Sequence, residues 1–138
     1  DDLVLKHQCP VLGICVGMQM MARCSEEGVL PGLGWIGATV KRFDDSHFQH
    51  KTRLPHMGWN DASPLESDTL FKQLDSPRFY FLHSYYFSPG DPAQVLAITD
   101  YNGAFASAVQ FGHMFGVQFH PEKSHQWGVR LLANFAEM

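Results

Sequence analysis

A cysteine flanked by glycines is the first feature of this sequence that could do chemistry. Cys15 lies at the centre of Gly13-Ile14-Cys15-Val16-Gly17, at the end of the apolar run Val11–Ile14. A Gly-x-Cys-x-Gly pattern between a strand and a helix is the cysteine version of the sharp turn that exposes a nucleophile. Glycines two positions before and after the nucleophile relieve crowding in such a strained turn. We expect the helix N-terminus to favour the thiolate and the Val16 amide to donate to an oxyanion.

A histidine late in the sequence could supply the base that such a cysteine needs. His120-Pro121-Glu122 follows the apolar stretch Phe115–Phe119, and an imidazole is the usual base for a cysteine nucleophile. A carboxylate two residues later can orient the imidazole, and the proline stiffens the link between them. Each motif alone also fits a structural role, as a buried cysteine or as a strand-end histidine before a helix-capping glutamate. Together they predict a catalytic triad of Cys15, His120 and Glu122.

The elements that must position these residues change in character along the chain. Val11–Ile14 is a nearly continuous apolar run, which is typical of a buried parallel strand. Further strands are predicted at residues 35–43, 79–87, 94–99, 104–110 and 115–119. Asn102-Gly103 is a strong signal for a hairpin turn. Helices are predicted at residues 16–23, from Ser67 or Asp68 to Leu74, and at residues 124–137. This order predicts an α/β fold whose sheet has an antiparallel section.

The composition excludes several classes of protein. The 138 residues are 45% hydrophobic and 17% charged, which fits a globular protein and argues against disorder. Ten Lys and Arg residues against fourteen Asp and Glu residues, without a basic run, predict no nucleic-acid partner. No apolar run approaches the roughly 18 residues of a membrane helix, so we expect no membrane partner. Three cysteines without an export signal predict reduced thiols in a cytoplasm, and no zinc-binding pattern occurs, so we expect no metal.

Four motifs in this sequence resemble a known family. Pro10–Gln19 and Gly116–Glu122 are similar to the nucleophile and base segments of class I (triad) glutamine amidotransferases. Leu54–Asn60 and Tyr80–Tyr85 resemble the glutaminase subunits of imidazole glycerol phosphate synthases. The four motifs occur in the order of the family and cover nearly the whole chain. The resemblance implies a flavodoxin-like, three-layer α/β fold and an enzyme that takes ammonia from glutamine.

The resemblance also implies a role for each matching residue. Cys15 would attack the side-chain amide of glutamine, His120 would act as general acid and base, and Glu122 would orient His120. The positions that match the glutamine-binding segments are Gln19, His83, Ser84 and Tyr85. The positions that match the partner interface and the ammonia exit are Trp59, Tyr80 and Lys123. The implied partner is a (β/α)₈ cyclase subunit that receives the ammonia, and the scheme requires no cofactor.

Most of these residues also have a structural interpretation. Trp59 and Tyr80 could be core aromatics, Lys123 a solvated charge, and Gln19 an ordinary polar residue of a helix. Family members carry strands and a Gly-rich loop before the nucleophile, and that loop supplies a second oxyanion amide. We therefore expect residues 1–138 to be the C-terminal two-thirds of an N-terminally truncated amidotransferase domain. An isolated chain of this kind should be poorly stable or inactive.

Three other functions stay open at this point. A related amidotransferase could deliver ammonia to a cell-surface sugar instead of to histidine synthesis. A catalytically silent docking module could have kept the fold. A cysteine hydrolase or peptidase would also use a cysteine nucleophile and a histidine base, as Cys15 and His120 could, although Gln19 and the His-Pro-Glu linkage favour an amidotransferase.

Overall fold

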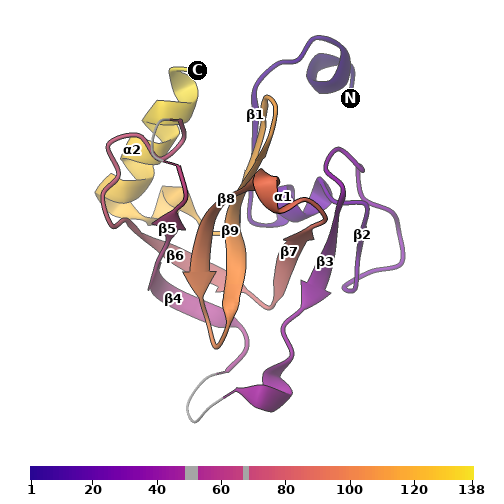
Figure 1. Ribbon diagram of the computed structural model, residues 1–138, viewed down its shortest axis with the longest axis vertical. Coiled ribbons are helices and arrows are strands. Elements are labelled where there is room, and N and C mark those ends of the chain that lie inside the picture. The colour runs from indigo at the N-terminus through magenta and orange to yellow at the C-terminus, as the bar shows by residue number, and fades with distance from the viewer. Residues whose placement is uncertain (49–52, 67–68) are drawn as a thin grey trace.

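The computed structural model describes residues 1–48, 53–66 and 69–138 of the chain. Within these residues, eight strands form one mixed sheet (Figure 1). They are β1 (Val11–Ile14), β2 (Cys24–Ser25), β3 (Ala38–Arg42), β5 (Ser63–Pro64), β7 (Tyr85–Pro89), β8 (Val95–Asp100), β9 (Ala104–Phe111) and β10 (Met114–Val117). Two more strands, β4 (His56–Asp61) and β6 (Arg78–His83), pair with each other as a separate ribbon. The helices are α1 (Val16–Met20) and α2 (His125–Ala136), and short helical turns are η1 (Asp2–Lys6), η2 (Asp45–His47), η3 (Pro92–Gln94) and η4 (Pro121–Lys123).

The main sheet combines parallel and antiparallel pairs, as the sequence predicts. β1 lies parallel to β10, with Gly13 opposite Gly116. β10, β9 and β8 follow one another as an antiparallel meander. β9 also contacts β7, and β7 pairs with β3. Because β1 and β10 run in the same direction, the segments that leave their carboxyl ends emerge on the same edge of the sheet.

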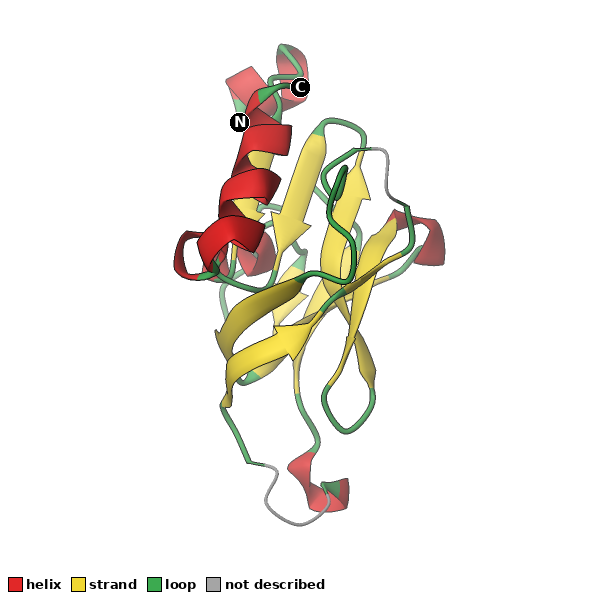
Figure 2. Ribbon diagram, turned by 90° about the vertical axis from the view of Figure 1, so that its left-hand side faces the viewer, coloured by secondary structure: helices red, strands yellow, loops and turns green. Residues whose placement is uncertain are grey.

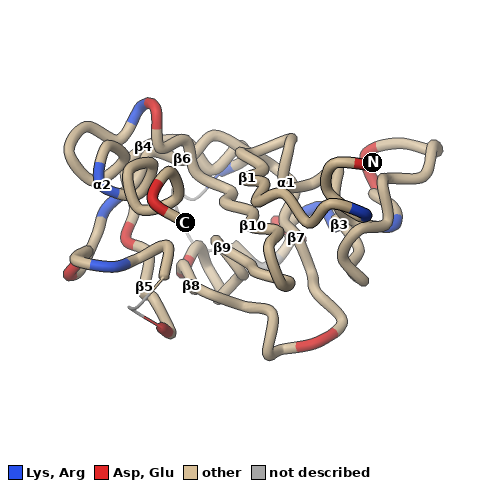
Figure 3. The backbone as a smooth tube through the Cα atoms, turned by 90° about the horizontal axis from the view of Figure 1, so that it is seen from above, with Lys and Arg blue, Asp and Glu red and all other residues tan. Residues whose placement is uncertain are grey.

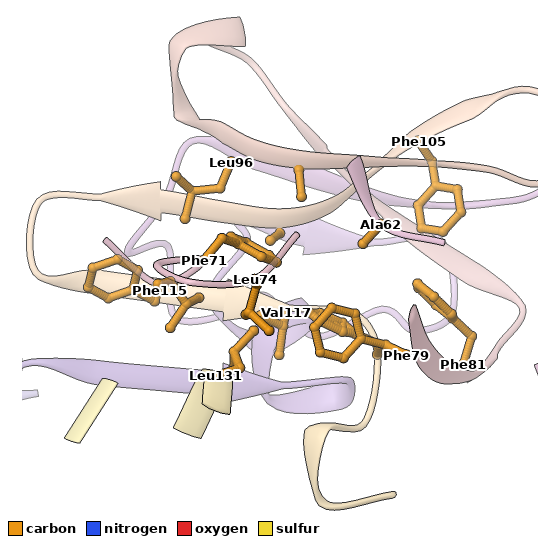
Figure 4. Packing of buried hydrophobic residues seen from close by; sticks show 14 of the residues in the cluster. Ala62, Phe71, Leu74, Phe79, Phe81, Leu96, Phe105, Phe115, Val117 and Leu131 are labelled. Carbon is orange, nitrogen blue, oxygen red and sulfur yellow. The ribbon is translucent and has the colours of Figure 1, made fainter. Parts of the chain in front are cut away.

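Two hydrophobic clusters cover the opposite faces of this sheet, as the alternation of side chains in strands requires. Ala108 and Val109, which are adjacent in β9, belong to different clusters. Met18 of α1 packs with Val109 on one face, and Leu131 of α2 packs on the other. The face that carries Leu131 is rich in phenylalanine, and Figure 4 shows several of these rings converging. The helices and the sheet therefore form three layers.

The β4–β6 ribbon has one buried and one exposed face. His83 and His56 lie opposite each other and are buried on the inner face. On the outer face, the side chain of Met57 is 64% exposed and that of Trp59 is 40% exposed. The backbone of Tyr80 in β6 bridges to His120, which joins the ribbon to the segment before α2. Figure 2 shows the ribbon crossing beside the main sheet.

The structure corrects several of the predicted elements. Residues 79–87 form β6 and β7 with a break at Ser84, and the sequence analysis predicts no strand for β4. The predicted helix of residues 16–23 ends at Met20. Its last carbonyl groups accept hydrogen bonds from a later loop, as in Leu33 N–H to Met20 O and Ile36 N–H to Met21 O. Ser67 and Asp68 lie outside the described residues, and residues 69–74 form turns instead of a helix.

Acidic and basic residues are interspersed around the backbone (Figure 3). Over the described ranges, no helix is long and apolar enough to span a membrane.

Candidate active site

Cys15 occupies a strained turn between β1 and α1. Its φ of 53° and ψ of −109° lie where non-glycine residues are rare, and such strain is characteristic of functional positions. A Cβ atom at Gly13 would lie 2.8 Å from the backbone of Gly17 and Met18, so Gly13 is required for this turn. A Cβ atom at Gly17 would meet no atom within 4 Å. Of the two flanking glycines, the structure therefore requires only the first for space.

The thiol of Cys15 favours its protonated form in this structure. Burial raises the pKa of the thiol above its ordinary value, and the Glu122 and Glu27 carboxylates raise that pKa further. Hydrogen bonds from the Val16 backbone and the Gln118 side chain lower it by less. The start of α1 does favour the thiolate, as expected, through the backbone N–H of Val16, but the loss of water raises the pKa by more than the two donors lower it. A base must therefore remove the thiol proton.

His120 and Glu122 form the predicted pair. Nδ1 of His120 lies 2.5 Å from Oε1 of Glu122. The backbone of His120 is fixed at both ends, since its N–H donates to the Tyr80 carbonyl at 2.8 Å and its carbonyl accepts from Oγ of Ser124 at 2.6 Å. In a neutral ring with its hydrogen on Nδ1 directed at the carboxylate, Nε2 of His120 is the atom that can accept a proton.

Two of the three residues of the predicted triad, His120 and Glu122, are hydrogen-bonded to each other, and the Glu122 charge acts on the Cys15 thiol. The thiol itself has other hydrogen-bond partners. Sγ of Cys15 lies 3.8 Å from the Leu82 carbonyl and 3.6 Å from Nε2 of Gln118. Within the described part of the chain, it has no hydrogen bond to His120. The Glu122 charge nevertheless acts on the thiol, which places the carboxylate within electrostatic reach. The proton transfer therefore requires the thiol or the imidazole to turn.

A cavity of about 240 Å³ opens at the thiol. It is lined by Cys15, Val16, Gln19, Glu27, Pro55, Leu82, His83, Ser84 and Tyr85. All four positions predicted to bind glutamine are in this set, together with the predicted nucleophile and the predicted oxyanion donor. Glu27 is not among the residues predicted from the sequence, because it lies in a loop without a motif. It contributes a carboxylate to the lining.

Gln19 is held by two hydrogen bonds inside the protein. Its Nε2 donates to Oε1 of Gln118 at 3.0 Å and to the Tyr85 carbonyl at 3.3 Å. Both amide hydrogens of Gln19 are thus in use, so that amide nitrogen has no hydrogen left to offer a ligand. Gln118 is fully buried and, like Glu27, is not among the residues predicted from the sequence. The signal for it was a polar residue in the apolar strand end Val117-Gln118-Phe119.

The ring of His83 is also engaged by the protein. Nδ1 of His83 lies 2.8 Å from the Tyr85 carbonyl, and Nε2 lies 3.0 Å from Nδ1 of His56. Burial lowers the pKa of His83 to about 4 against the opposing hydrogen bond to Tyr85, and the nearby His120 lowers it further. Burial, and then the proximity of His83, lower the pKa of His56 to about 3. Both rings are therefore neutral at physiological pH.

The three positions predicted to face a partner lie together at the ribbon. The rings of Trp59 and Tyr80 meet edge to face, with centroids 6.5 Å apart. Nζ of Lys123 lies 5.9 Å from the centroid of the Tyr80 ring, within the range of a cation–π contact. Trp59 also stacks on His125. Trp59 is half-exposed on the outer face, which is inconsistent with a core aromatic.

The described residues offer no candidate metal site. Over residues 1–48, 53–66 and 69–138, no group of three or more His, Cys, Asp or Glu side chains could hold a metal ion. The three cysteines are free thiols, and Cys9 and Cys24 are exposed.

Comparisons with known proteins identify relatives over the whole chain. The family model for "Glutamine amidotransferase class-I" matches residues 1–138. The imidazole glycerol phosphate synthase subunit HisH of Bdellovibrio bacteriovorus is 51% identical over 139 residues, covering 100% of this chain and 68% of the relative. The subunit of the same name from Leptospira interrogans is 48% identical, with the same coverage. This chain therefore spans about two-thirds of the length of these curated relatives.

Solved structures resemble the fold at lower sequence identity. PurLQS from Thermotoga maritima matches with a TM-score of 0.71 and 18% identity, covering 97% of this chain and 64% of that one. The glutaminase domain of Trypanosoma brucei CTPS with bound acivicin matches with a TM-score of 0.58 and 18% identity, covering 93% and 60%. A structure titled as a glutamine amidotransferase matches with a TM-score of 0.69 and 21% identity, covering 99% and 64%. These likenesses confirm the fold predicted from the resemblance.

Proposed function

This chain belongs to the class I glutamine amidotransferase family, and from that premise we propose that it hydrolyses glutamine to glutamate and ammonia for an imidazole glycerol phosphate synthase. The observation that carries the proposal is the strained Cys15 turn, which opens on a cavity lined by all four of the predicted glutamine-binding residues. The names of the relatives support histidine biosynthesis as the pathway. We assign residues 1–138 to one glutamine amidotransferase domain.

The reaction begins with removal of the thiol proton. Nε2 of His120 accepts the proton from Cys15, and Glu122 stabilises the imidazolium that results. The thiolate attacks the side-chain amide carbon of glutamine, and the Val16 N–H donates to the oxyanion. Because burial keeps the resting thiol protonated, the nucleophile forms only when the imidazole accepts the proton.

The same imidazole completes the reaction. His120 returns its proton to the leaving nitrogen, so the C–N bond breaks and ammonia departs, leaving a glutamyl thioester on Cys15. A water molecule then gives a proton to Nε2 of His120 and attacks the thioester carbon. The C–S bond breaks, glutamate is released, and the thiol recovers its proton. The scheme uses residues of this chain and water, without a metal or an organic cofactor.

Glu27 gives the cavity a feature that fits the other end of the substrate. Free glutamine carries an α-ammonium group, which needs an acceptor when it leaves water. Glu27 is the one carboxylate among the residues that line the described cavity. We assign Glu27 to the α-ammonium group of the substrate.

The outer face of the ribbon supports the partner assignment. Met57, Trp59 and Leu82 are exposed there, and Tyr80 and Lys123 adjoin them. Exposed apolar and aromatic side chains of this kind are typical of protein interfaces. We propose that a (β/α)₈ synthase subunit docks on this face as a heterodimer and receives the ammonia. A catalytic thiol must stay reduced, so we place the protein in the cytoplasm.

The test uses the whole protein that carries this sequence, together with the synthase subunit. Glutamate release from glutamine is measured with and without the synthase and its ligand, and Cys15→Ala is the control. The proposal expects release that increases with the partner and disappears in Cys15→Ala. Release that depends on Cys15 but ignores this partner would move the acceptor to another pathway. Absence of release under every condition would contradict the proposed activity.

A further inference from the structure

The thiol of Cys15 is one end of a continuous hydrogen-bonded network. We propose that Gln118 is a positioning residue for this thiol, and that a hydrogen-bonded relay reaching back to Asn60 holds Gln118 in place. The relay comprises Asn60, His56, His83, the Tyr85 carbonyl, Gln19 and Gln118, of which the His56, His83 and Gln118 side chains are buried. It connects the β4–β6 ribbon to the nucleophile. The inference rests on the proposed function only for its kinetic consequence, since the geometry is independent of the reaction.

The direction of every hydrogen bond in the first half of the relay follows from Asn60. Oδ1 of Asn60 accepts from the N–H of Asp61 at 2.7 Å, which fixes the orientation of the amide. Nδ2 of Asn60 then donates to the Asp100 carbonyl at 3.0 Å and to Nε2 of His56 at 3.1 Å. Because Nε2 of His56 accepts, Nδ1 of the neutral ring carries the hydrogen and donates to Nε2 of His83. His83 in turn donates from Nδ1 to the Tyr85 carbonyl.

The second half of the relay starts from the same carbonyl. The Tyr85 oxygen also accepts from Nε2 of Gln19, and the other hydrogen of that amide goes to Oε1 of Gln118. The amide of Gln118 is therefore oriented with its nitrogen toward Sγ of Cys15, at 3.6 Å. Gln118 lies 103 positions after Cys15 and is fully buried. A buried amide in this place would be costly without the partners that it has.

Stacking keeps the remote part of the relay in place. The His56 ring lies between the rings of Phe81 and Tyr101, with centroid distances of 4.6 Å and 3.9 Å. Neither the His56 ring nor the His83 ring has an alternative polar partner that would allow it to turn freely, among the hydrogen bonds of the described chain. The hydrogen bond from Gln118 also lowers the pKa of the thiol. Loss of that bond should therefore make the thiol less acidic as well as less well oriented.

The first test reads the relay directly in the unaltered protein. Nitrogen-15 NMR of the whole protein reports the tautomer of each histidine. The relay requires neutral rings with the hydrogen on Nδ1 for both His56 and His83. An Nε2–H tautomer at either residue would overturn the inference. This measurement needs no variant and no substrate, so its outcome is independent of the proposed activity.

The second test follows the thiol chemically. Alkylation of Cys15 by iodoacetamide is measured against pH by mass spectrometry of the Cys15 peptide, because Cys9 and Cys24 are also free. Gln118→Met removes the donor and keeps the length of the side chain. We expect its alkylation profile to move to higher pH and its kcat for glutamine to fall by about 10-fold, with KM changed by less than about twofold. An unchanged profile in a folded Gln118→Met protein would overturn the positioning role.

The third test acts from the far end of the relay. His56→Phe keeps the stacking on Phe81 and Tyr101 but removes both hydrogen bonds of the ring. We expect kcat to fall by about three- to tenfold, with KM little changed. The matched control is Thr99→Val, which also removes a buried polar group, since the Thr99 hydroxyl is buried and has no hydrogen-bond partner among the residues that the structure describes. Wild-type kcat in a folded His56→Phe protein would overturn the claim that the relay extends beyond Gln118.

The outcomes of these tests distinguish the proposed relay from the proposed glutaminase activity. Correct tautomers and a shifted alkylation profile, in a protein that releases no glutamate, would support the relay and contradict the amidotransferase activity. Glutamate release with the wrong tautomers would do the reverse.

Discussion

The thiol of Cys15 points at the backbone carbonyl of Leu82, with Sγ and the oxygen 3.8 Å apart. The side chain of Leu82 is on the exposed outer face of the ribbon. One residue thus contacts the nucleophile through its backbone and presents its side chain to the surface where we place the partner.

Glu122→Gln should affect the reaction and the resting thiol in opposite directions. The glutamine cannot stabilise the imidazolium, so we expect kcat to fall by about 10- to 100-fold with little change in KM. Removal of the carboxylate charge also removes one cause of the raised pKa of Cys15. Alkylation of Cys15 near neutral pH should therefore become faster while turnover becomes slower. Both rates falling together would argue against the assigned role of Glu122.

Glu27→Gln tests the assignment of the α-ammonium site. The variant keeps the size of the side chain and removes its charge, so KM for glutamine should rise by about 10-fold or more, with a smaller effect on kcat. Steady-state kinetics measures both values. Glu26→Gln is the matched control, because Glu26 accepts a hydrogen bond from the Arg42 backbone and does not line the cavity. An equal rise of KM in both variants would contradict a specific role for Glu27.

Gly13→Ala and Gly17→Ala should differ sharply in stability. The new methyl at Gly13 would lie 2.8 Å from backbone atoms that cannot move aside, so we expect a loss of about 2–3 kcal/mol in the free energy of unfolding. The methyl at Gly17 has open space in a helix, where alanine is preferred over glycine, so its effect should be within about 1 kcal/mol of zero or favourable. Urea denaturation measures both. Equal losses would mean that the turn differs from the one described.

Acid should destabilise the protein through His56 and His83. Their folded pKa values of about 3 and about 4 lie below the value of an unfolded histidine, so the unfolded chain binds more protons between about pH 6.5 and pH 4. Their contribution to stability is complete above about pH 6.5 and is lost as the pH falls through that window, by up to about 1.4 kcal/mol per pH unit for each ring.

Unfolding free energies at pH 7, 6 and 5 measure this slope. His56→Phe should make it shallower, since one of the two buried rings is gone. His7→Gln removes an exposed histidine and should leave the slope as it is. A slope that is the same in all three proteins would contradict the assignment of the acid sensitivity to the buried pair.

The sequence predicted the elements whose signals are local. The apolar run Val11–Ile14 is β1 within the same bounds, and Asn102-Gly103 does form a turn, with φ values of 53° and 132°. The pairing of His120 with Glu122 was also predictable, because the two residues are only two positions apart. In each case, the residues that determine the conformation are neighbours in the chain.

The elements that were missed depend on contacts between distant residues. α1 ends at Met20 because backbone N–H groups of residues 33–36 donate to the carbonyls that would otherwise continue the helix. β4 forms because its backbone pairs with that of β6. The position of Gln118 was equally hidden, since a single polar residue in an apolar strand end does not reveal its partners. The role of Gln19 as part of a relay follows only from the folded arrangement.

The parallel pairing of β1 with β10 has a consequence for the order in which the site is made. The chain from residue 15 to residue 118 must be synthesised and folded before the two segments can meet, so closing this long loop carries a large entropic cost that only the completed sheet offsets. The thiol of Cys15 and the imidazole of His120 can therefore come together only after β10 has been synthesised and has paired with β1.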